Sequence, residues 1–218
     1  MKKKLLIIVL NLFFVGALSA QEWRANGFAS YVFDDNVDSY YSNTSYYDGK
    51  IKGGFVWGVG LEYMLHPGYG LGLNYYRQDT EAPMTYYDNG AKTKTFDLTG
   101  DWFMLAGTRY VQKGKAELYG GFELGAVFFD VSNSLSGKSG SGTKFAWGIK
   151  LGSNIFFNER VGIKLQADLR SAVQAAGGGL YFGTGGAGAG VSTYSTIYQF
   201  GLGGGLVFRF PPKTGAAK

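Results

Sequence analysis

The chain has 218 residues and no cysteine, which excludes disulfides, zinc–thiolate sites and a lipid-modified N-terminal cysteine. Three lysines near the N-terminus supply most of its net charge of +5. Without them the basic count falls from 21 to 18 against 16 acidic residues, a net charge of +2 that gives no support to a nucleic-acid partner. The 36 glycines, 16 tyrosines and 17 phenylalanines exceed the usage of ordinary globular domains and are typical of barrel strands.

Residues 1–20 have the layout of a secretory signal peptide. The basic segment Met1–Lys4 precedes an apolar run from Leu5 to Val15, which is too short to cross about 30 Å of hydrocarbon as a helix. We therefore expect an exported mature chain with a membrane domain over 21–210 and a short tail over 211–218. No later stretch approaches about 18 continuous apolar residues, so any membrane span must be a closed β-barrel.

Along the mature chain, apolar and polar residues alternate with a period of two in eight segments, which predicts eight β-strands. The expected strands cover 23–33, 54–65, 69–78, 98–111, 116–129, 145–157, 161–169 and 195–210. Long polar loops are expected at 34–52, 79–97, 131–143 and 177–190, and short turns at 66–68, 112–115 and 158–160. Pro83 argues against a central strand inside the second long loop.

The hairpin over 145–169 shows the alternation most clearly, because one face is apolar throughout and the other carries Gly, Asn, Lys, Gln and Asp. Lipid outside and a polar lumen inside would produce this pattern. In the fourth strand the same reasoning predicts that Trp102, Met104, Ala106 and Tyr110 face outward. It also predicts that Asp101 and Arg109 face the lumen.

Long and short connections alternate strictly along the chain, as they do in bacterial outer-membrane barrels with long extracellular loops and short periplasmic turns. Four long loops and three turns give eight strands with both ends in the periplasm. The predicted fold class is therefore all-β, a closed antiparallel up-and-down eight-stranded transmembrane β-barrel.

Two stretches support a family resemblance: WGIKLGSNIFFNERVGIKLQADLR, and the closing GLYFGTGGAGAGVST with QFGLGGGLVFRF. Together with the signal peptide, they resemble the small outer-membrane barrels of the OmpA/OmpX type, and more specifically the Bacteroidetes "porin family". The resemblance implies a monomer in the bacterial outer membrane. Its expected partners are outer-membrane lipid, periplasmic chaperones and the barrel-assembly machinery. The tail after Phe210 departs from the family, whose members usually end near the terminal aromatic residue.

Charged residues on the expected lumen face are the first candidate site, either as an ion pathway or as a salt-bridge network that fills a narrow barrel. An eight-stranded barrel has room only for side chains, which favours the network. Neutralising Glu123 is then expected to lower stability and to admit brief conducting events. The residues are Arg24, Glu62, Asp101, Arg109, Glu117, Glu123, Lys150, Lys164, Asp168, Arg170 and Arg209.

Each of three weaker motifs has a purely structural interpretation as well as a functional one. The single histidine, His66, lies in a short turn before Pro67, and a Ser/His/Asp triad would need a histidine elsewhere. The GxGxxG match at 183–188 is followed by a strand rather than a helix, so we expect a loop or a strand extension and no cofactor. Six loop tyrosines form either a binding surface for glycan, protein or a divalent cation, or an interfacial belt. They are Tyr40, Tyr41, Tyr46, Tyr47, Tyr86 and Tyr87.

We therefore expect a non-enzymatic outer-membrane barrel with a filled lumen and with extracellular loops for structural, adhesive or surface-binding roles. A small porin-like channel is the alternative, and an outer-membrane lipid-modifying enzyme is the second alternative. No catalytic residue, cofactor or metal site is predicted.

Overall fold

The computed structural model describes residues 22–42, 45–66, 68–87, 91–133, 138–177, 179–183, 186–190 and 197–212. The predicted signal peptide over 1–20 and most of the tail over 211–218 lie outside these ranges. Within them no helix is long and apolar enough to cross a bilayer.

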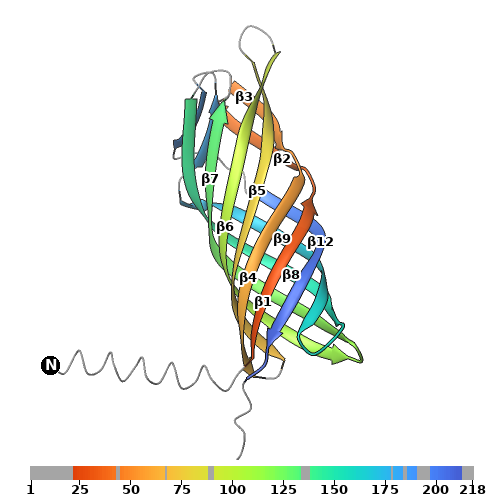
Figure 1. Ribbon diagram of the computed structural model, residues 1–218. Helices are drawn as coiled ribbons and strands as arrows, with labels where there is room; N and C mark the ends of the chain where they lie inside the picture. Colours follow the sequence, from red (N-terminus) through yellow and green to blue (C-terminus); the bar gives the residue numbers. More distant parts are fainter. Residues whose placement is uncertain are drawn as a thin grey trace, which may run out of the picture.

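Eight antiparallel strands close into a barrel, which confirms the predicted fold class (Figure 1). Neighbours follow the order β4-β1-β12-β9-β8-β7-β6-β5, and β5 pairs with β4 to close the ring. The strands are β1 (Trp23–Val32), β4 (Gly54–His66), β5 (Tyr69–Tyr87), β6 (Ala91–Lys113), β7 (Ala116–Asn133), β8 (Lys138–Phe156), β9 (Val161–Gly177) and β12 (Ile197–Phe210).

Short turns join the strands at one end of the barrel, which we call the turn end. Gly68 and Gly114 have φ angles of 86° and 62°, in the left-handed region that glycine enters without steric cost. In the β8–β9 turn, the side-chain oxygen of Asn158 accepts hydrogen bonds from the backbone N–H groups of Arg160 and Val161, both at 2.8 Å. These local features fix three reversals, so consecutive strands pair as hairpins.

At the opposite end, which we call the hairpin end, the connections expected as loops consist largely of paired strands. β5 and β6 pair without a break from Tyr69–Arg109 to Tyr87–Ala91, so the prediction of a loop over 79–97 is wrong. Pro83 of β5 pairs with Thr95 of β6. On its other side, no residue of β3 or β4 is paired with it. Its missing N–H therefore removes no ladder hydrogen bond.

Two further hairpins extend this end. β2 (Asp35–Ser42) pairs with β3 (Ser45–Ile51), and β3 continues the sheet beside β5, as Figure 1 shows above the barrel. The backbone N–H of Tyr198 donates to the Asp35 carboxylate at 2.8 Å, which ties the start of β2 to β12. β10 (Gly179–Gly183) and β11 (Gly186–Gly190) form a separate two-stranded sheet at the GxGxxG match, so the described backbone there is a strand extension.

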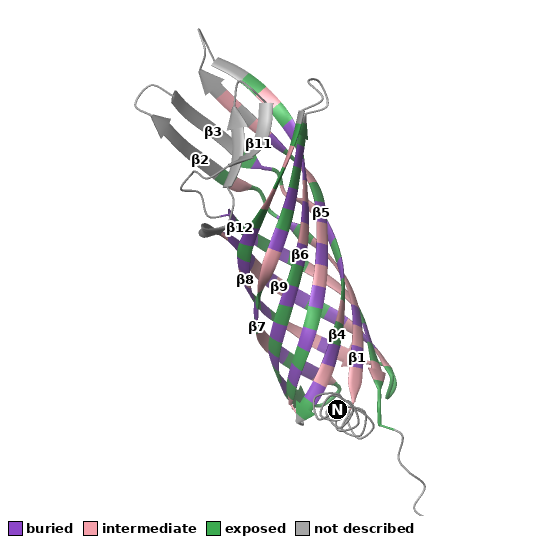
Figure 2. Cartoon of the chain, turned by 90° about the vertical axis from the view of Figure 1, so that its left-hand side faces the viewer, coloured by how far each residue is buried: buried purple, intermediate pink, exposed green. Residues whose placement is uncertain are grey.

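The strands alternate between buried and exposed residues along the barrel (Figure 2). Large apolar side chains cover the outer face, with Leu73 as much as 66% exposed. Aromatic pairs lie toward both ends of this face. Trp23 and Tyr63 are 5.0 Å apart near the turn end, and Trp57 and Tyr75 are 5.6 Å apart toward the hairpin end. An apolar belt between aromatic girdles is the surface that a lipid bilayer covers.

The predicted faces of the fourth strand are wrong. In β6, Trp102, Met104, Ala106 and Tyr110 are buried inside the barrel, whereas Asp101 and Arg109 lie on the outer face with Phe103 and Leu105. Asp101 accepts a hydrogen bond at 2.6 Å from the outward Tyr75 hydroxyl. Both faces of this strand carry large apolar residues, because the lumen beside its middle is itself apolar. Polarity therefore does not identify the lipid-facing side here.

Candidate functional site: the filled lumen

The structure places nine of the eleven predicted lumen charges inside the barrel, and only Asp101 and Arg109 fall outside. The nine do not form one uniform network. They divide into a cluster near the turn end and a cluster at mid-barrel, and an apolar plug lies beyond them toward the hairpin end.

Glu117 is the centre of the cluster near the turn end. Arg24 donates to both of its carboxylate oxygens, at 2.7 and 3.1 Å, in the bidentate geometry that guanidinium and carboxylate favour. Arg209 and Asn154 add donors at 3.0 and 3.1 Å. Glu22 accepts a further hydrogen bond from Arg24 at 2.5 Å. One carboxylate therefore receives two guanidinium groups. Removing Glu117 would leave the buried Arg24 and the half-buried Arg209 without this partner.

Aromatic rings line the same cluster and share its charges. The Tyr110 hydroxyl donates to Glu62 at 2.5 Å, and the Arg24 guanidinium lies 4.6 Å from the Tyr110 ring centre. Lys164 places its ammonium 4.1 Å from the centre of the Tyr119 ring. Cation–π contacts of this kind stabilise a cation that has lost its water. Tyr110 and Tyr119 were not among the predicted site residues, although their pairing with charges explains why tyrosine lines this lumen.

Glu123 is the centre of the mid-barrel cluster. Its carboxylate faces the Lys150 ammonium at 3.1 Å and accepts hydrogen bonds from Asn74 at 2.6 Å and the Tyr76 hydroxyl at 3.0 Å. Beside it, Arg170 donates through Nε to Asp168 at 3.0 Å. The Lys150–Glu123 ion pair joins β8 to β7 and so cross-links the barrel wall from inside, whereas the Arg170–Asp168 pair lies along β9.

Toward the hairpin end the lumen is filled by apolar side chains, which the predicted polar lumen did not include. Trp102, Tyr76, Val127 and Phe129 pack into one buried cluster with apolar residues of every neighbouring barrel strand, and Phe28 of β1 packs against it. The other members are Val32, Ile51, Val56, Ala82, Phe96, Leu98, Met104, Val131, Ala146, Ala172 and Ile197. This cluster, the apolar plug, has the composition of a soluble protein core.

The plug and the charge clusters form two barriers in series along the lumen. An ion that entered from the turn end would meet paired charges first and then a packed apolar layer. Side-chain packing at the density of a protein core leaves few voids as large as a water molecule. The geometry is therefore that of a closed lumen rather than a continuous water path.

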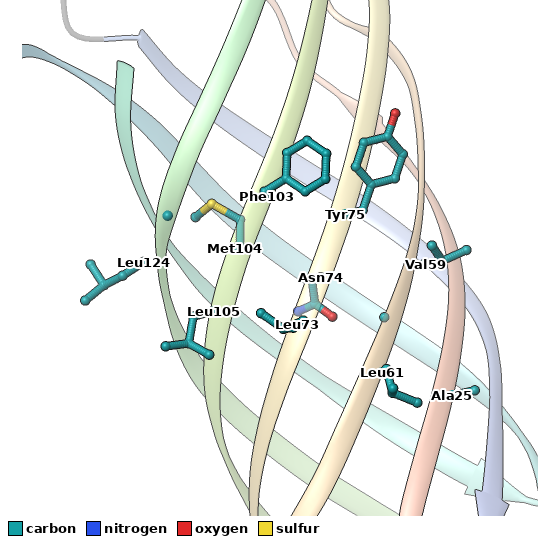
Figure 3. A pocket seen from close by; sticks show the side chains of 12 residues that line it. Ala25, Val59, Leu61, Leu73, Asn74, Tyr75, Phe103, Met104, Leu105 and Leu124 are labelled. Atoms are coloured by element: carbon teal, nitrogen blue, oxygen red, sulfur yellow. The ribbon is translucent and has the colours of Figure 1, made fainter. Parts of the chain in front are cut away.

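On the outer face, two rows of side chains border a shallow apolar hollow of about 620 Å³ (Figure 3). One row runs across β4 to β7 as Leu61, Leu73, Leu105 and Leu124, which are cross-strand neighbours. The second row, toward the hairpin end, contains Val59, Tyr75 and Phe103. The hollow lies within the apolar belt, where acyl chains would fill it.

Beyond the belt, the outer wall of β6, β7 and β8 is polar. A hollow of about 300 Å³ there is lined by two carboxylates and four hydroxyls. They belong to Asp97, Asp130, Thr99, Ser132, Ser139 and Ser141. The Thr99 hydroxyl donates to Asp79 at 2.8 Å, and Asp79 pairs with Arg77 at 3.0 Å. The arrangement marks where the wall changes from apolar to hydrated.

The backbone pairing brings several of the predicted loop tyrosines together at the hairpin end. Tyr40 lies opposite Tyr46, and Tyr47 lies opposite Tyr86 on the neighbouring strand, while Tyr87 ends β5 opposite Ala91. The remaining one, Tyr41, lies at an irregularity in the β2–β3 pairing. The side chains of these six residues lie outside the described part, as does that of His66, whose backbone ends β4 at the turn end. Among the described side chains, no three His, Cys, Asp or Glu residues lie together as a metal ion would need.

Solved structures with a similar fold are outer-membrane proteins. The chain is similar to OprG from Pseudomonas aeruginosa, with a TM-score of 0.58 and 12% identity over 88% of this chain and 97% of that one. It is similar to Neisserial surface protein A, with a TM-score of 0.53 and 12% identity over 86% and 97% of the two chains. The outer membrane protease OmpT from Escherichia coli follows at 0.51 and 9%, over 87% and 97%. No protein-family model and no curated protein sequence matches the chain.

Proposed function

We propose that this protein is an integral outer-membrane barrel that does not conduct ions and whose role is structural, adhesive or surface-binding. Its hairpin end faces the outside and its turn end faces the periplasm. The observation that carries the proposal is the lumen, which is closed by the apolar plug in series with two charge clusters. The paired hairpins beyond the belt are the part that would meet a partner.

The outer face supports the location. Apolar side chains cover the barrel wall between the two girdles, and an isolated water-soluble protein rarely exposes so large an apolar surface. OprG and Neisserial surface protein A, which share the fold, are named as outer-membrane and surface proteins. Membership of the OmpA/OmpX type and of the Bacteroidetes "porin family" belongs to the same proposal. So do export by a signal peptide, a monomeric state, and assembly by periplasmic chaperones and the barrel machinery.

The channel and enzyme alternatives make different predictions about the lumen. A channel needs a continuous water path, which the buried ring of Trp102 and its neighbours obstructs. An enzyme needs a cluster of reactive groups at the outer mouth; OmpT shows that barrels of this kind include a protease. The single histidine of this chain lies at the turn end, on the side away from the outer mouth.

Electrical recording in planar bilayers tests the proposal. We expect no steady conductance from the refolded wild type. The double variant Trp102→Ala/Phe129→Ala removes large side chains from the plug, and Leu105→Ala is its control because it removes volume from the outer face of the same strand. Large, stable, ion-selective steps from the wild type would overturn the closed-lumen proposal and favour the channel.

A further inference from the structure

The exposed charges of the barrel are separated by sign between its two ends. At the turn end, the exposed charged residues that the structure describes are one acid, Glu159, and four bases. The bases are Arg109, Lys113, Lys115 and Arg160. At the hairpin end, the described exposed residues are five acids and two bases. The acids are Asp34, Asp79, Glu81, Asp97 and Asp130, and the bases are Lys50 and Lys52. The turn end is therefore the positive end of the outer surface.

The bases at the two ends also differ in how they are held. At the hairpin end, Lys50 pairs with Asp34 at 2.8 Å, and Lys52 pairs with Glu81 at 2.8 Å. None of the four turn-end bases forms an ion pair with a carboxylate in the part of the chain that the structure describes. Water solvates exposed bases well, so this difference alone does not identify a partner. The position of Arg109 does.

Arg109 lies against the lipid-facing wall at the edge of the apolar belt. It is on the outer face of β6, the face that also carries Phe103 and Leu105. Its Cζ atom is 4.0 Å from the ring centre of Tyr69, an outward residue that is 50% exposed, and its Nη1 donates to the Gly68 carbonyl at 3.5 Å. These contacts hold the guanidinium beside an interfacial tyrosine. A cation placed there borders lipid headgroups, and an anionic headgroup offsets its charge.

The four bases form one arc along the rim of the barrel. Lys113 lies on the same face of β6 as Arg109, and Lys115 follows it in the β6–β7 turn. Ala116, directly after that turn, pairs with Ile155, so the β8–β9 turn that carries Arg160 lies alongside. The strands β6, β7, β8 and β9 are consecutive neighbours in the barrel wall. One leaflet of a bilayer would therefore meet all four bases.

We propose that this arc, the basic rim, binds the phosphate headgroups of anionic phospholipids in the leaflet at the turn end. Charge complementarity selects an anionic headgroup. The position of Arg109 on the barrel wall selects a membrane lipid, because a soluble anion would reach the turns but not the edge of the belt. Each base favours an anionic over a neutral headgroup about fivefold at low salt, the equivalent of about 1 kcal/mol near an anionic surface. The acidic hairpin end repels the same headgroups.

The inference rests on the membrane location proposed above, but not on the closed lumen. Lipid selectivity at the barrel surface tests it. The wild type is refolded into phosphatidylcholine vesicles that contain a trace of spin-labelled phosphatidylglycerol or spin-labelled phosphatidylcholine. Electron paramagnetic resonance then measures the fraction of each label that the protein immobilises. We expect phosphatidylglycerol to be preferred at low salt and the preference to fall as added salt screens the charges.

The two ways in which this experiment can fail are distinguishable. A barrel that inserts into the vesicles but immobilises both labels equally would overturn the basic rim and leave the membrane location intact. A chain that refolds but does not insert would overturn the membrane location, and the basic rim with it. Inorganic phosphate at constant ionic strength should leave the preference unchanged. Competition by inorganic phosphate would assign the bases to phosphate in solution and overturn the lipid as the partner.

Two double variants locate the preference on the barrel. Arg109→Gln/Lys113→Gln removes two bases of the basic rim, and Lys50→Gln/Lys52→Gln removes two bases at the hairpin end as a matched control. We expect the first variant to lose most of the preference for phosphatidylglycerol and the control to keep it. All of these side chains are exposed, so both variants should fold. An equal loss in the two variants, or an unchanged preference in the first, would contradict the basic rim.

Discussion

Glu123 shows how this barrel keeps a charge in its interior. Its side chain is 1% exposed, and its carboxylate receives an ammonium, an amide N–H and a phenol O–H. An ionised carboxylate that has lost its water is tolerated only with such partners. The same carboxylate also fixes Tyr76, whose ring supports Arg170 at 4.5 Å. One residue therefore positions groups on three other strands.

Replacing Glu123 with Ala should destabilise the barrel without opening it. The change leaves Lys150 buried without its partner, and breaking a buried ion pair in this way costs about 3–5 kcal/mol. Urea unfolding in lipid vesicles measures the loss, with Glu159→Ala in the exposed β8–β9 turn as the control. Contrary to the expectation from sequence, the variant should remain electrically silent, because the apolar plug is a separate barrier. Unchanged stability of Glu123→Ala would contradict a stabilising role for this ion pair.

Among the strands, β6 is the one whose sequence says least about which face points to the lumen. In the hairpin of β8 and β9, Lys150, Lys164 and Asp168 mark the lumen face unambiguously, so alternation predicts every side chain. In β6 the lumen face carries Trp102 and Met104 instead, because this strand lines the plug. When both faces of a strand are apolar, polarity does not show which face points to lipid. Only the pairing of all eight strands decides this.

An arginine scan tests the corrected faces of β6. Leu105 is 50% exposed on the outer face, so Leu105→Arg should lower the free energy of unfolding by about 2–4 kcal/mol, as for a cation near the middle of a bilayer. Leu151→Arg, on the outer face of β8, should cost a similar amount. If Leu105→Arg were as stable as the wild type, Leu105 would face the lumen, and the faces predicted from the sequence would be right for this strand.

The hairpins are the second place where the sequence fell short. Their strands lie beyond the apolar belt, so no lipid imposes a pattern on them, although most of them pair with the next strand along the chain. Side-chain contacts also hold the first hairpin: the Asp34 carboxylate accepts the Gly53 N–H at 2.7 Å and pairs with Lys50 at 2.8 Å. These contacts join the two ends of the β2–β3 hairpin at its base.

The base of this hairpin should respond to acid. The hydrogen bond from Lys50 and that from the Gly53 N–H lower the pKa of Asp34 below its ordinary value of 3.8. A lowered pKa means that the ordering effect is complete at neutral pH and is lost as the pH falls through that lowered pKa. A spin label at Asn36→Cys should become more mobile only in that acid range. With Asp34→Asn the mobility should be raised at neutral pH and the acid step should disappear; an unchanged step would assign it to another group.

At the scale of the whole molecule, the connections between strands alternate. Short turns lie at one end of the barrel and paired hairpins at the other. Sequence predicted the barrel, its eight strands and most of its lumen charges, because membrane and lumen impose opposite polarity on alternate residues. It did not predict the division of the lumen into polar and apolar parts. That division depends on which residues of different strands share a level, and the barrel's shear sets this.

Cysteine labelling tests the orientation of the whole barrel. Tyr46, Gly140 and Gly186 lie in strands of the hairpin end, and Asn89 lies between β5 and β6 in the sequence. Single cysteines at these four positions should react with impermeant reagents on intact cells. A cysteine at Gly114 belongs to the turn end and should react only after the outer membrane is opened. Labelling of Gly114→Cys on intact cells, with protection of the other four, would invert the orientation.

The unbroken pairing of β5 with β6 also has a mechanical consequence. The 19 residues of β5 all pair with β6, from the turn end to the far tip of the hairpin. A force applied at that tip would pull β5 and β6 in the same direction, so the ladders that join this pair to β4 and β7 would be loaded in shear. The β5–β6 ladder itself is unbroken, so the pair would move as one unit. The hairpin would then act as a rigid extension of the barrel that transmits tension from a tethered surface directly to the barrel wall.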